Sequence, residues 1–267
     1  MPEASEVAAE AAAGPVDDPP VGVIGGVGPL ATAYFLELVV RLTEAERDQD
    51  HVDLVVLNHA TIPDRTDFVL GRSTLDPGPV LARDARRLEA FGVSFLVMPC
   101  NTAHYFTRHV TDAVSVPFVS IVEAVVEAAC DRVPGLSTVG VLATEGTVAS
   151  GVYADAFARS RVKVLEPDVA DQQIVSAVIY DQVKAGRPVD VDALRGVAGR
   201  LAARGAAVVV LGCTELSVVA ADHGLLDDPL YLDSLDVLAR ETITRAGRRV
   251  RGRAQVPAAS GPRAAGR

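Results

Sequence analysis

Two stretches of this sequence, FLVMPCNTAH (95–104) and VVVLGCTELS (208–217), share one outline and decide the fold. Each begins with consecutive apolar residues and ends in a cysteine, Cys100 or Cys213, followed by residues that can begin a helix. Strands that are apolar on both faces are typical of a parallel sheet covered by helices on both sides. Ligands of such sheets bind outside the carboxyl ends of the strands. The pattern therefore places both thiols where a ligand would bind.

The likeness continues on both sides of the two cysteines, which indicates an internal repeat. VGVIGGVGPLATAYFLEL begins at residue 21 and VGVLATEGTVASGVYADAF at residue 139, and both read as strand, small-residue turn and helix. Strands that start with proline, at residues 117 and 229, also correspond. Apolar runs that alternate with amphipathic stretches predict an α/β fold. We expect two similar parallel-sheet α/β domains related by a pseudo-two-fold axis, with the active site in the cleft between them.

The repeat and the composition of the ends predict the domain boundaries. The first domain would comprise residues 21–115 together with 229–246, and the second residues 116–228. Residues 1–20 hold five acids among Ala and Pro, and residues 247–267 are rich in Arg, Ala, Gly and Pro without an acid. Neither end can bury an apolar face, so we expect two disordered tails, one acidic and one basic. The dispersed arginines lack interleaved aromatic residues, which favours a solvated extension over a nucleic-acid or membrane contact.

The composition also excludes several classes of protein. With 25 basic and 35 acidic residues the formal net charge is −10, so nucleic acid is not an expected partner. No apolar run is long enough to span a bilayer and the N-terminus does not resemble a secretory signal, so we expect no membrane partner. Three cysteines without a disulfide spacing indicate a reducing compartment, and we expect a cytoplasmic protein.

The position of the two thiols suggests acid/base chemistry. Each cysteine precedes a helix, whose N-terminal N–H groups favour negative charge. This position is expected to lower a thiol pKa from about 8.5 toward neutrality. Asn101, Thr102 and Thr214 can cap these helices and donate hydrogen bonds to a ligand carboxylate. Two thiols on opposite sides of a small anion can remove a proton from one face and return one to the other, which is the chemistry of a racemase or an epimerase.

The cysteines allow other interpretations. A cysteine at a strand end can be a small buried hydrophobe, and Cys130, in EAACDRV, keeps that interpretation because it has neither a partner nor a turn. Cys100 and His104 are four residues apart and, with Cys213, suggest an alternative zinc site and a Cys/His zinc hydrolase. Ser217 stands where a further ligand after Cys213 would be needed. We therefore expect no metal.

The glycine turn GVGPLA (26–31) has an alternative interpretation of its own. It satisfies a loose dinucleotide-binding fingerprint after a strand. The acid that would bind the ribose is absent, because Asn58 and His59 stand near the end of the second strand. Pro29 at the first helical turn suits a tight helix start. The turn is better explained by backbone that approaches the carboxylate of a small ligand.

Five motifs, in order along the chain, carry a family resemblance. They are GGVGPLAT (25–32), NHATIPDR (58–65), PCNTAH (99–104), VKAG (183–186) and GCTEL (212–216). Together they resemble the aspartate racemase branch of the aspartate/glutamate racemase superfamily, whose members need no pyridoxal phosphate. The resemblance covers about residues 21–246 and leaves out only the two tails.

The resemblance implies a role for each matching residue. Cys100 and Cys213 would be the two acid/base cysteines, Arg65 would hold a substrate carboxylate, and Lys184 would lie near a second carboxylate. Further substrate contacts would come from the glycine turn and from residues next to the cysteines and in the repeated turn: Val27, Gly28, Asn101, Thr102, Thr144 and Thr214. The implied reaction is cofactor-independent racemisation of an acidic amino acid, aspartate first and glutamate next, by a homodimer.

Two departures from the family patterns bear on the substrate. The family commonly has Met where Val27 stands, so the pocket here would differ in width or shape. Glutamate racemases of cell-wall synthesis carry a histidine after the second Cys-Thr, where this chain has Glu215. A protein of this fold that binds a ligand without turnover is the alternative. We also expect the loop 60–71, which carries Arg65, to act as part of a closing lid.

Overall fold

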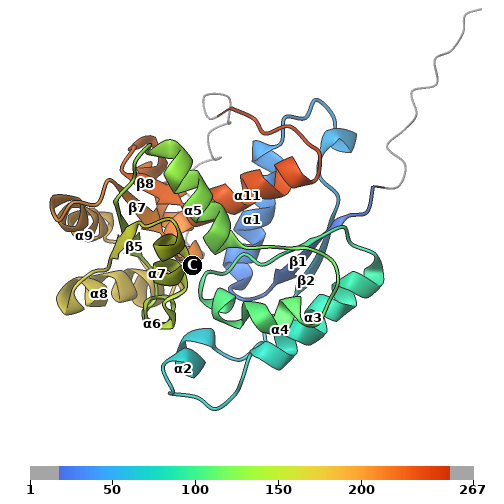
Figure 1. The fold of residues 1–267 in the computed structure, drawn as a ribbon, viewed down its shortest axis with the longest axis horizontal. Coiled ribbons are helices and arrows are strands. Elements are labelled where there is room, and N and C mark those ends of the chain that lie inside the picture. The colour runs from blue at the N-terminus through green and yellow to red at the C-terminus, as the bar shows by residue number, and fades with distance from the viewer. Residues whose placement is uncertain (1–17, 253–267) are drawn as a thin grey trace, which may run out of the picture.

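The computed structural model describes residues 18–252, and residues 1–17 and 253–267 lie outside the described residues. The first half of the chain forms a four-stranded parallel sheet in the order β2-β1-β3-β4 (Figure 1). Its strands are β1 (Val21–Gly25), β2 (Leu54–Asn58), β3 (Leu96–Val97) and β4 (Phe118–Val119). Because the chain goes from β1 to one side and then to the other, the switch point lies between the carboxyl ends of β1 and β3.

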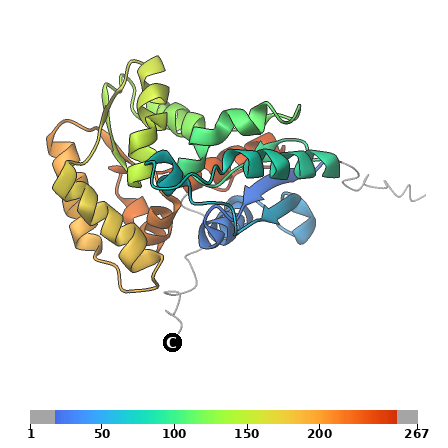
Figure 2. The ribbon, with the colours of Figure 1, turned by 90° about the horizontal axis from the view of Figure 1, so that it is seen from below.

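The second half repeats this arrangement. Its sheet has the order β6-β5-β7-β8, again with all strands parallel. The strands are β5 (Thr138–Leu142), β6 (Lys163–Leu165), β7 (Val208–Leu211) and β8 (Tyr231–Asp233). Position by position, the order matches that of the first sheet, so the α/β class and the repeat expected from the sequence are confirmed. In Figure 2 the blue elements of the first half lie at one end, the yellow and orange elements of the second half lie at the other, and a green and a red helix lie between them.

Helices cover both sheets. Those of the first half are α1 (Pro29–Leu42), α2 (Arg65–Val69), α3 (Gly78–Phe91), α4 (Thr107–Thr111) and α5 (Ile121–Arg132), with 3₁₀ turns η1 (Asp48–Asp50) and η2 (Thr102–Phe106). Those of the second half are α6 (Glu145–Ser150), α7 (Val152–Arg159), α8 (Val169–Ser176), α9 (Val191–Ala203), α10 (Thr214–Asp222) and α11 (Ser234–Arg245), with the π-helical segment η3 (Ala177–Val183) and the 3₁₀ turn η4 (Leu225–Asp227). No helix within residues 18–252 combines the length and the apolar character needed to cross a membrane.

The two halves share one apolar core. Val139 in β5 and Val208 and Val210 in β7 point into a cluster that also contains residues of β1, α1, α5, α7 and α11. The alternate residues of β7, Val209 and Leu211, point into a separate core beneath α8, α9 and α10. This alternation follows from the period of two along a strand. Each sheet therefore has one face toward the other half and one toward its own outer helices.

The last strand and helix of each half cross the expected domain boundary. The sequence-based division placed the strand near residues 117–121 with the second half and the strand near 229–234 with the first. The pairing is the reverse, because β4 pairs with β3 and β8 pairs with β7. The helices after these strands explain the difference: α5 packs on α7 and α11 packs on α1 (Figure 1). Each half thus covers its partner with its last helix, and the apolar surface of that helix belongs to the shared core.

The turn after β1 is fixed by glycine. Gly26 has a positive φ of 83°, and a Cβ there would come within 2.3 Å of the His59 backbone. The Thr32 hydroxyl closes the turn by accepting a hydrogen bond from the Gly26 N–H at 3.0 Å. The turn therefore brings the start of α1 close to the end of β2.

The first residues of the expected basic tail are ordered against the body. Val250 forms an antiparallel bridge with Thr43, and the Arg251 N–H donates to the Leu42 carbonyl at 2.6 Å. Val250 is also one of the partly buried apolar residues packed on the shared core. The prediction of a disordered tail from residue 247 onward is therefore not met up to residue 252, and the remaining tail residues lie outside the described chain.

Candidate active site

A small cavity lies where the two halves meet. Its volume is about 20 Å³ for the centre of a water-sized sphere, which suffices for one water molecule. It is lined by residues of the loops and helices that follow β1, β2, β3, β5, β6 and β7: Val27, Asp64, Arg65, Thr66, Cys100, Asn101, Thr102, Thr144, Tyr180, Lys184, Cys213, Thr214 and Glu215. Every residue predicted to form the site is in this lining except Gly28.

The two cysteines occupy corresponding places in the repeat. Cys100 is the third residue after β3 and precedes the 3₁₀ turn η2, whereas Cys213 is the second residue after β7 and the N-cap residue of α10. Both are free thiols and both side chains are buried, with 7% and 6% of their surface exposed. The sheet order places each one beside the carboxyl end of the central strand of its own half, β1 or β5.

The thiol pKa values differ from the expectation. We expected the helix starts to lower them, but burial raises the pKa of both thiols above the ordinary value. At Cys100 the nearby guanidinium of Arg65 opposes this effect. At Cys213 the carboxylate of Glu215 adds to it, and the pKa is raised well above that of a free cysteine. Desolvation thus outweighs the backbone N–H groups at both sites.

Arg65 brings a positive charge to the cavity from the first turn of α2. Its Nη1 donates to the carbonyls of Ile62 at 3.3 Å and Pro63 at 3.1 Å, which holds the side chain against its own loop. Its Nε is buried and has no hydrogen-bond partner among residues 18–252. A buried guanidinium N–H without a partner is costly unless a ligand supplies an acceptor. The arrangement is therefore suited to a carboxylate.

Lys184 brings the second positive charge, directly after η3. Its Nζ lies 3.7 Å from Oε1 of Glu215 and 4.6 Å from the ring centre of Tyr180. Burial would lower the pKa of Lys184, but Glu215 and Cys213 outweigh burial and raise it overall. The amine is therefore held in its charged form beside the cavity.

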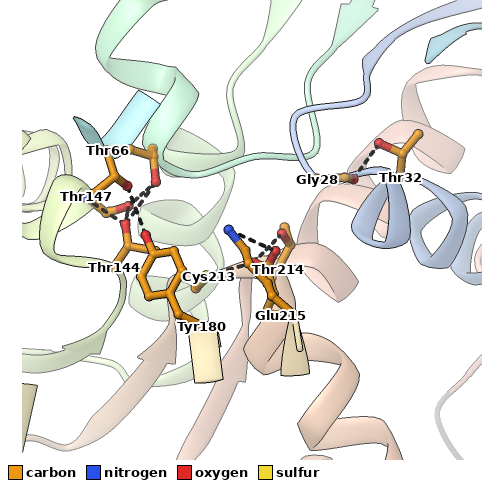
Figure 3. A network of polar contacts seen from close by, with 11 residues as sticks. Gly28, Thr32, Thr66, Thr144, Thr147, Tyr180, Cys213, Thr214 and Glu215 are labelled. Atoms are coloured by element: carbon orange, nitrogen blue, oxygen red, sulfur yellow. Dashed lines mark hydrogen bonds and ion pairs between the residues drawn. The ribbon is translucent and has the colours of Figure 1, made fainter. Parts of the chain in front are cut away.

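Hydroxyl groups join the two halves across the cavity. Oγ1 of Thr102 lies 3.0 Å from that of Thr144 and 2.7 Å from that of Thr147, and Thr144 caps α6 by accepting from the Thr147 N–H. The Tyr180 hydroxyl donates to Oγ1 of Thr66 at 3.2 Å, which joins η3 to α2. Figure 3 shows the Tyr180 ring between these threonines and Cys213.

Asn101 is held by the second half rather than left free for a ligand. The Tyr153 hydroxyl donates to Oδ1 of Asn101 at 2.6 Å, and Nδ2 of Asn101 donates to the Ser234 hydroxyl at 3.1 Å. The predicted contact between Asn101 and a substrate would thus have to use the second N–H of the amide. Its described contacts instead fix the backbone beside Cys100.

The glycine turn contributes Val27 to the cavity wall, and Val27 is also part of the core beneath α3. Gly28 lies in a wider neighbouring cleft of about 490 Å³, which it shares with Arg65, Lys184 and Glu215. A Cβ at Gly28 would come 3.4 Å from Oε1 of Glu215. A second cleft, of about 540 Å³, lies on the other side of Asp64, Thr66 and Tyr180.

The residues that close the cavity between these clefts were not singled out from the sequence as site residues. Thr66 directly follows Arg65, and Tyr180 lies four residues before Lys184, a spacing that puts both on one helical face. Glu215 stands two residues after Cys213 and was noted only as a difference from glutamate racemases. These spacings were the available signals, but none of them specifies a contact between α2 and η3.

The alternative zinc site is not formed. Nδ1 of His104 lies 2.8 Å from the Cys100 carbonyl, and Nε2 accepts from the Ile121 N–H at 3.1 Å. Burial lowers the pKa of His104 to about 4, so the ring is neutral and both nitrogens are engaged. Within residues 18–252, no group of three or more His, Cys, Asp or Glu residues is arranged to hold a metal ion.

The chain is similar to known racemases over most of its length. A broad specificity amino-acid racemase of Bacillus subtilis is 28% identical over 229 residues, which cover 84% of this chain and 96% of the relative. The solved structure of Picrophilus torridus aspartate racemase is 28% identical, with a TM-score of 0.75, and the match covers 88% of this chain and 96% of that one. An aspartate racemase homologue from Pyrococcus horikoshii OT3 is 25% identical, with a TM-score of 0.70 and coverage of 86% and 100%.

The family model described as Asp/Glu/Hydantoin racemase matches residues 24–242. This range includes both cysteines, Arg65 and Lys184, together with all eight strands except the first three residues of β1. The protein belongs to the Asp/Glu/hydantoin racemase family.

Proposed function

We propose that this protein racemises an acidic amino acid at Cα, with Cys100 and Cys213 as the two bases, and that aspartate is the first candidate substrate and glutamate the second. One observation carries the proposal: two thiols, each after the corresponding strand of its own sheet, line one cavity together with Arg65 and Lys184. The family and the aspartate racemase structures support the same reaction class.

In the proposed reaction, the thiolate of one cysteine removes the Cα proton and becomes a thiol. The thiol of the other cysteine then donates its proton to the opposite face of Cα and becomes a thiolate. The carboxylate of the intermediate would accept from Arg65, whose Nε is free to donate. Fixed donors in a site closed to water stabilise developing negative charge more than they would in water. Lys184, already next to Glu215, would face a second carboxylate on the substrate side chain.

The raised pKa values of the two thiols determine whether kcat/KM rises or falls with pH. Both pKa values lie above the ordinary value of 9.0, so in the empty site near neutral pH both sulfurs are mostly protonated. The reaction needs one thiolate, whose fraction grows with pH. We therefore expect kcat/KM to rise as the pH rises from neutral into the alkaline range.

Proton NMR in deuterated water tests the function directly. With L-aspartate, and then L-glutamate, we expect loss of the α-proton signal and appearance of the D-enantiomer on chiral analysis. Cys100→Ala and Cys213→Ala should each abolish racemisation, and each variant should exchange the α-proton of one enantiomer only. Cys130→Ala is the matched control, because Cys130 is a half-buried free thiol outside the cavity lining, and it should keep the parent rate. Racemisation at the parent rate by either single variant would refute the two-base mechanism.

The homodimer and the cytoplasmic localisation stay predictions of the family resemblance and of the reduced cysteines, respectively. Light scattering of the purified chain measures its mass in solution. A mass of one chain, 27.9 kDa, would contradict the homodimer.

A further inference from the structure

The two thiols have different neighbours at corresponding positions of the repeat. Thr102 stands two residues after Cys100, whereas Glu215 stands two residues after Cys213. Glu215 lies in the first turn of α10, and only 12% of its side chain is exposed. A nearly buried carboxylate therefore lies beside one thiol and a neutral hydroxyl follows the other.

The Glu215 carboxylate connects the thiol of Cys213 with a cation. The thiol donates to Oε2 of Glu215 at 3.0 Å, and the Thr214 hydroxyl donates to the same oxygen at 3.4 Å. The other oxygen, Oε1, lies 3.7 Å from Nζ of Lys184. Figure 3 shows Glu215 and Cys213 side by side, with their contacts drawn. A carboxylate accepts hydrogen bonds and cannot donate one while ionised, so this contact requires the proton to be on Cys213.

The sulfur of Cys100 has the opposite kind of surroundings. The Ala103 N–H donates to it, and the strongest influence of a charged group on it comes from Arg65; both favour the thiolate. Among the described residues, no carboxylate is hydrogen-bonded to this sulfur. Glu215 also acts on Cys100, but as a smaller influence than Arg65.

The other charged and titratable groups around Cys213 do not change this contrast. Lys184 favours its thiolate but is itself paired with Glu215. Tyr153 and Tyr180 also interact with Cys213, and the pKa of each phenol is raised, so both are neutral below the alkaline range. Asp64 and Arg65 line the same cavity but are not among the main influences on the pKa of Cys213. Glu215 is therefore the group that separates the two thiols.

We propose that Glu215 is a positioning residue that keeps Cys213 protonated in the empty enzyme, so that Cys213 begins the reaction as the acid and Cys100 begins it as the base. This inference rests on the proposed function. Cys100 as thiolate would take the Cα proton and Cys213 would give its own to the other face, which leaves Cys100 as thiol and Cys213 as thiolate. The Cys213 thiolate would then face Glu215 and take a proton from water, and the next turnover would begin once Cys100 has again lost a proton to water.

Titration of single thiols tests the inference without substrate. Cys100→Ser with Cys130→Ala leaves Cys213 as the only thiol, and Cys213→Ser with Cys130→Ala leaves Cys100. Ultraviolet absorbance of the thiolate then gives each midpoint. Adding Glu215→Gln should lower the Cys213 midpoint by about one pH unit or more, a tenfold change in thiolate, and should move Cys100 less. Racemisation rates cannot show which cysteine begins as the base. The two enantiomers have equal free energy, so kcat/KM must be the same for both of them whichever thiol is ionised first.

Glu145→Gln is the matched control. Glu145 also lies in the first turn of a helix that follows a strand, pairs with Arg72 at 3.0 Å, and does not line the cavity. Its substitution should leave both midpoints unchanged. Glu215→Asp keeps the charge but draws it back from the sulfur, and it should give a smaller downward shift of the Cys213 midpoint than Glu215→Gln. This second variant also serves if Glu215→Gln does not fold.

Two results would overturn the inference: a Cys213 midpoint that Glu215→Gln leaves in place, or one that moves no more than the Cys100 midpoint does. Failure of the proposed function is a separate result, namely no deuterium exchange by the unmodified protein. The thiol titrations need no substrate, so they test the role of Glu215 whether or not the protein shows exchange.

Discussion

Arg65 is the residue whose hydrogen bonds most directly indicate a missing ligand, because one of its buried N–H groups has no acceptor among residues 18–252. This group is Nε, while Nη1 is anchored to two backbone carbonyls. The anchoring fixes the plane of the guanidinium before a carboxylate arrives. A lysine at this position would keep the charge but could not offer paired donors in a fixed plane.

We expect Arg65→Lys to weaken the use of acidic substrates. Loss of a hydrogen bond to a charged group costs about 1.5–3 kcal/mol, which corresponds to roughly a 10-fold to 100-fold lower kcat/KM. Steady-state kinetics with the substrate found by NMR measure the change. Arg87→Lys is the control, since Arg87 lies in α3 with a largely exposed side chain paired to Asp84. Equal kinetics for Arg65→Lys and the parent would contradict the role of Arg65.

Residue types and order along the chain were enough to predict most of the cavity lining, but not the ionisation of the thiols. The repeat was enough to predict that the two cysteines converge, whereas Arg65 and Lys184 were predicted from the motifs that carry the family resemblance. The direction of the thiol pKa shift could not. It depends on how completely water is excluded from the sulfurs and on the Glu215 carboxylate, and both are properties of the packed site rather than of the local sequence.

At the scale of elements, the cavity is closed by the meeting of α2 and η3. The hydrogen bond between Tyr180 and Thr66 joins them, and wider clefts lie on both sides of the contact. Arg72, which follows α2, pairs with Glu145 of α6 at 3.0 Å. Because the cavity volume of about 20 Å³ is that of roughly one water molecule, we expect one of these elements to move when a substrate enters. The lid expected over residues 60–71 stays a prediction.

Tyr180→Phe isolates this contact. The ring stays, but the hydrogen bond to Thr66 is lost, so we expect faster amide hydrogen exchange in residues 60–71 of the substrate-free protein. Hydrogen exchange followed by mass spectrometry measures it. Tyr105→Phe is the control, because Tyr105 is exposed and its edge contact with Phe106 needs only the ring. Unchanged exchange in that segment after Tyr180→Phe would mean that the hydrogen bond does not hold α2 closed.

The likeness of the two parallel sheets followed from the repeat, whereas the division between the halves did not. The sequence marks β4 and β8 as apolar runs, but it does not state which sheet each one joins. In the structure the apolar faces of α5 and α11 are buried in the core that the two halves share, where α5 packs on α7 and α11 packs on α1. Local pattern specifies an amphipathic helix, and tertiary packing specifies its partner.

At the scale of the whole molecule, a buried carboxyl group, that of Asp233, lies between two residues of the shared core, Leu232 and Leu235. Asp233 ends β8 and caps α11 by accepting from the Leu235 and Asp236 N–H groups, and it also accepts from the Ser217 hydroxyl. Burial raises the pKa of Asp233 from 3.8 to about 7. Since the folded protein holds this proton more tightly than the unfolded chain, the group stabilises the fold fully below about pH 4, and that contribution is lost as the pH rises through about 7.

We therefore expect the parent to lose more stability than Asp233→Asn as the pH rises from 5 to 8. Between pH 5 and the Asp233 pKa of about 7 the difference grows by about 1.4 kcal/mol per pH unit, to roughly 3 kcal/mol at most, and Asn cannot titrate. Urea denaturation at the two pH values gives the free energy of unfolding of both proteins. Asp112→Asn, at the end of α4 and on the surface, should follow the parent. Parallel pH curves for parent and Asp233→Asn would show that Asp233 does not titrate in this range.

The repeated architecture has a consequence for how such a site can diverge. A site built by two identical chains around a two-fold axis must give both thiols the same neighbours, because any substitution appears twice. With both copies in one continuous chain, each can change alone. Thr102 and Glu215, at matching positions after Cys100 and Cys213, are a pair that differs in this way. Covalent linkage of the halves thus frees a symmetric scaffold to hold an asymmetric pair of acid/base groups.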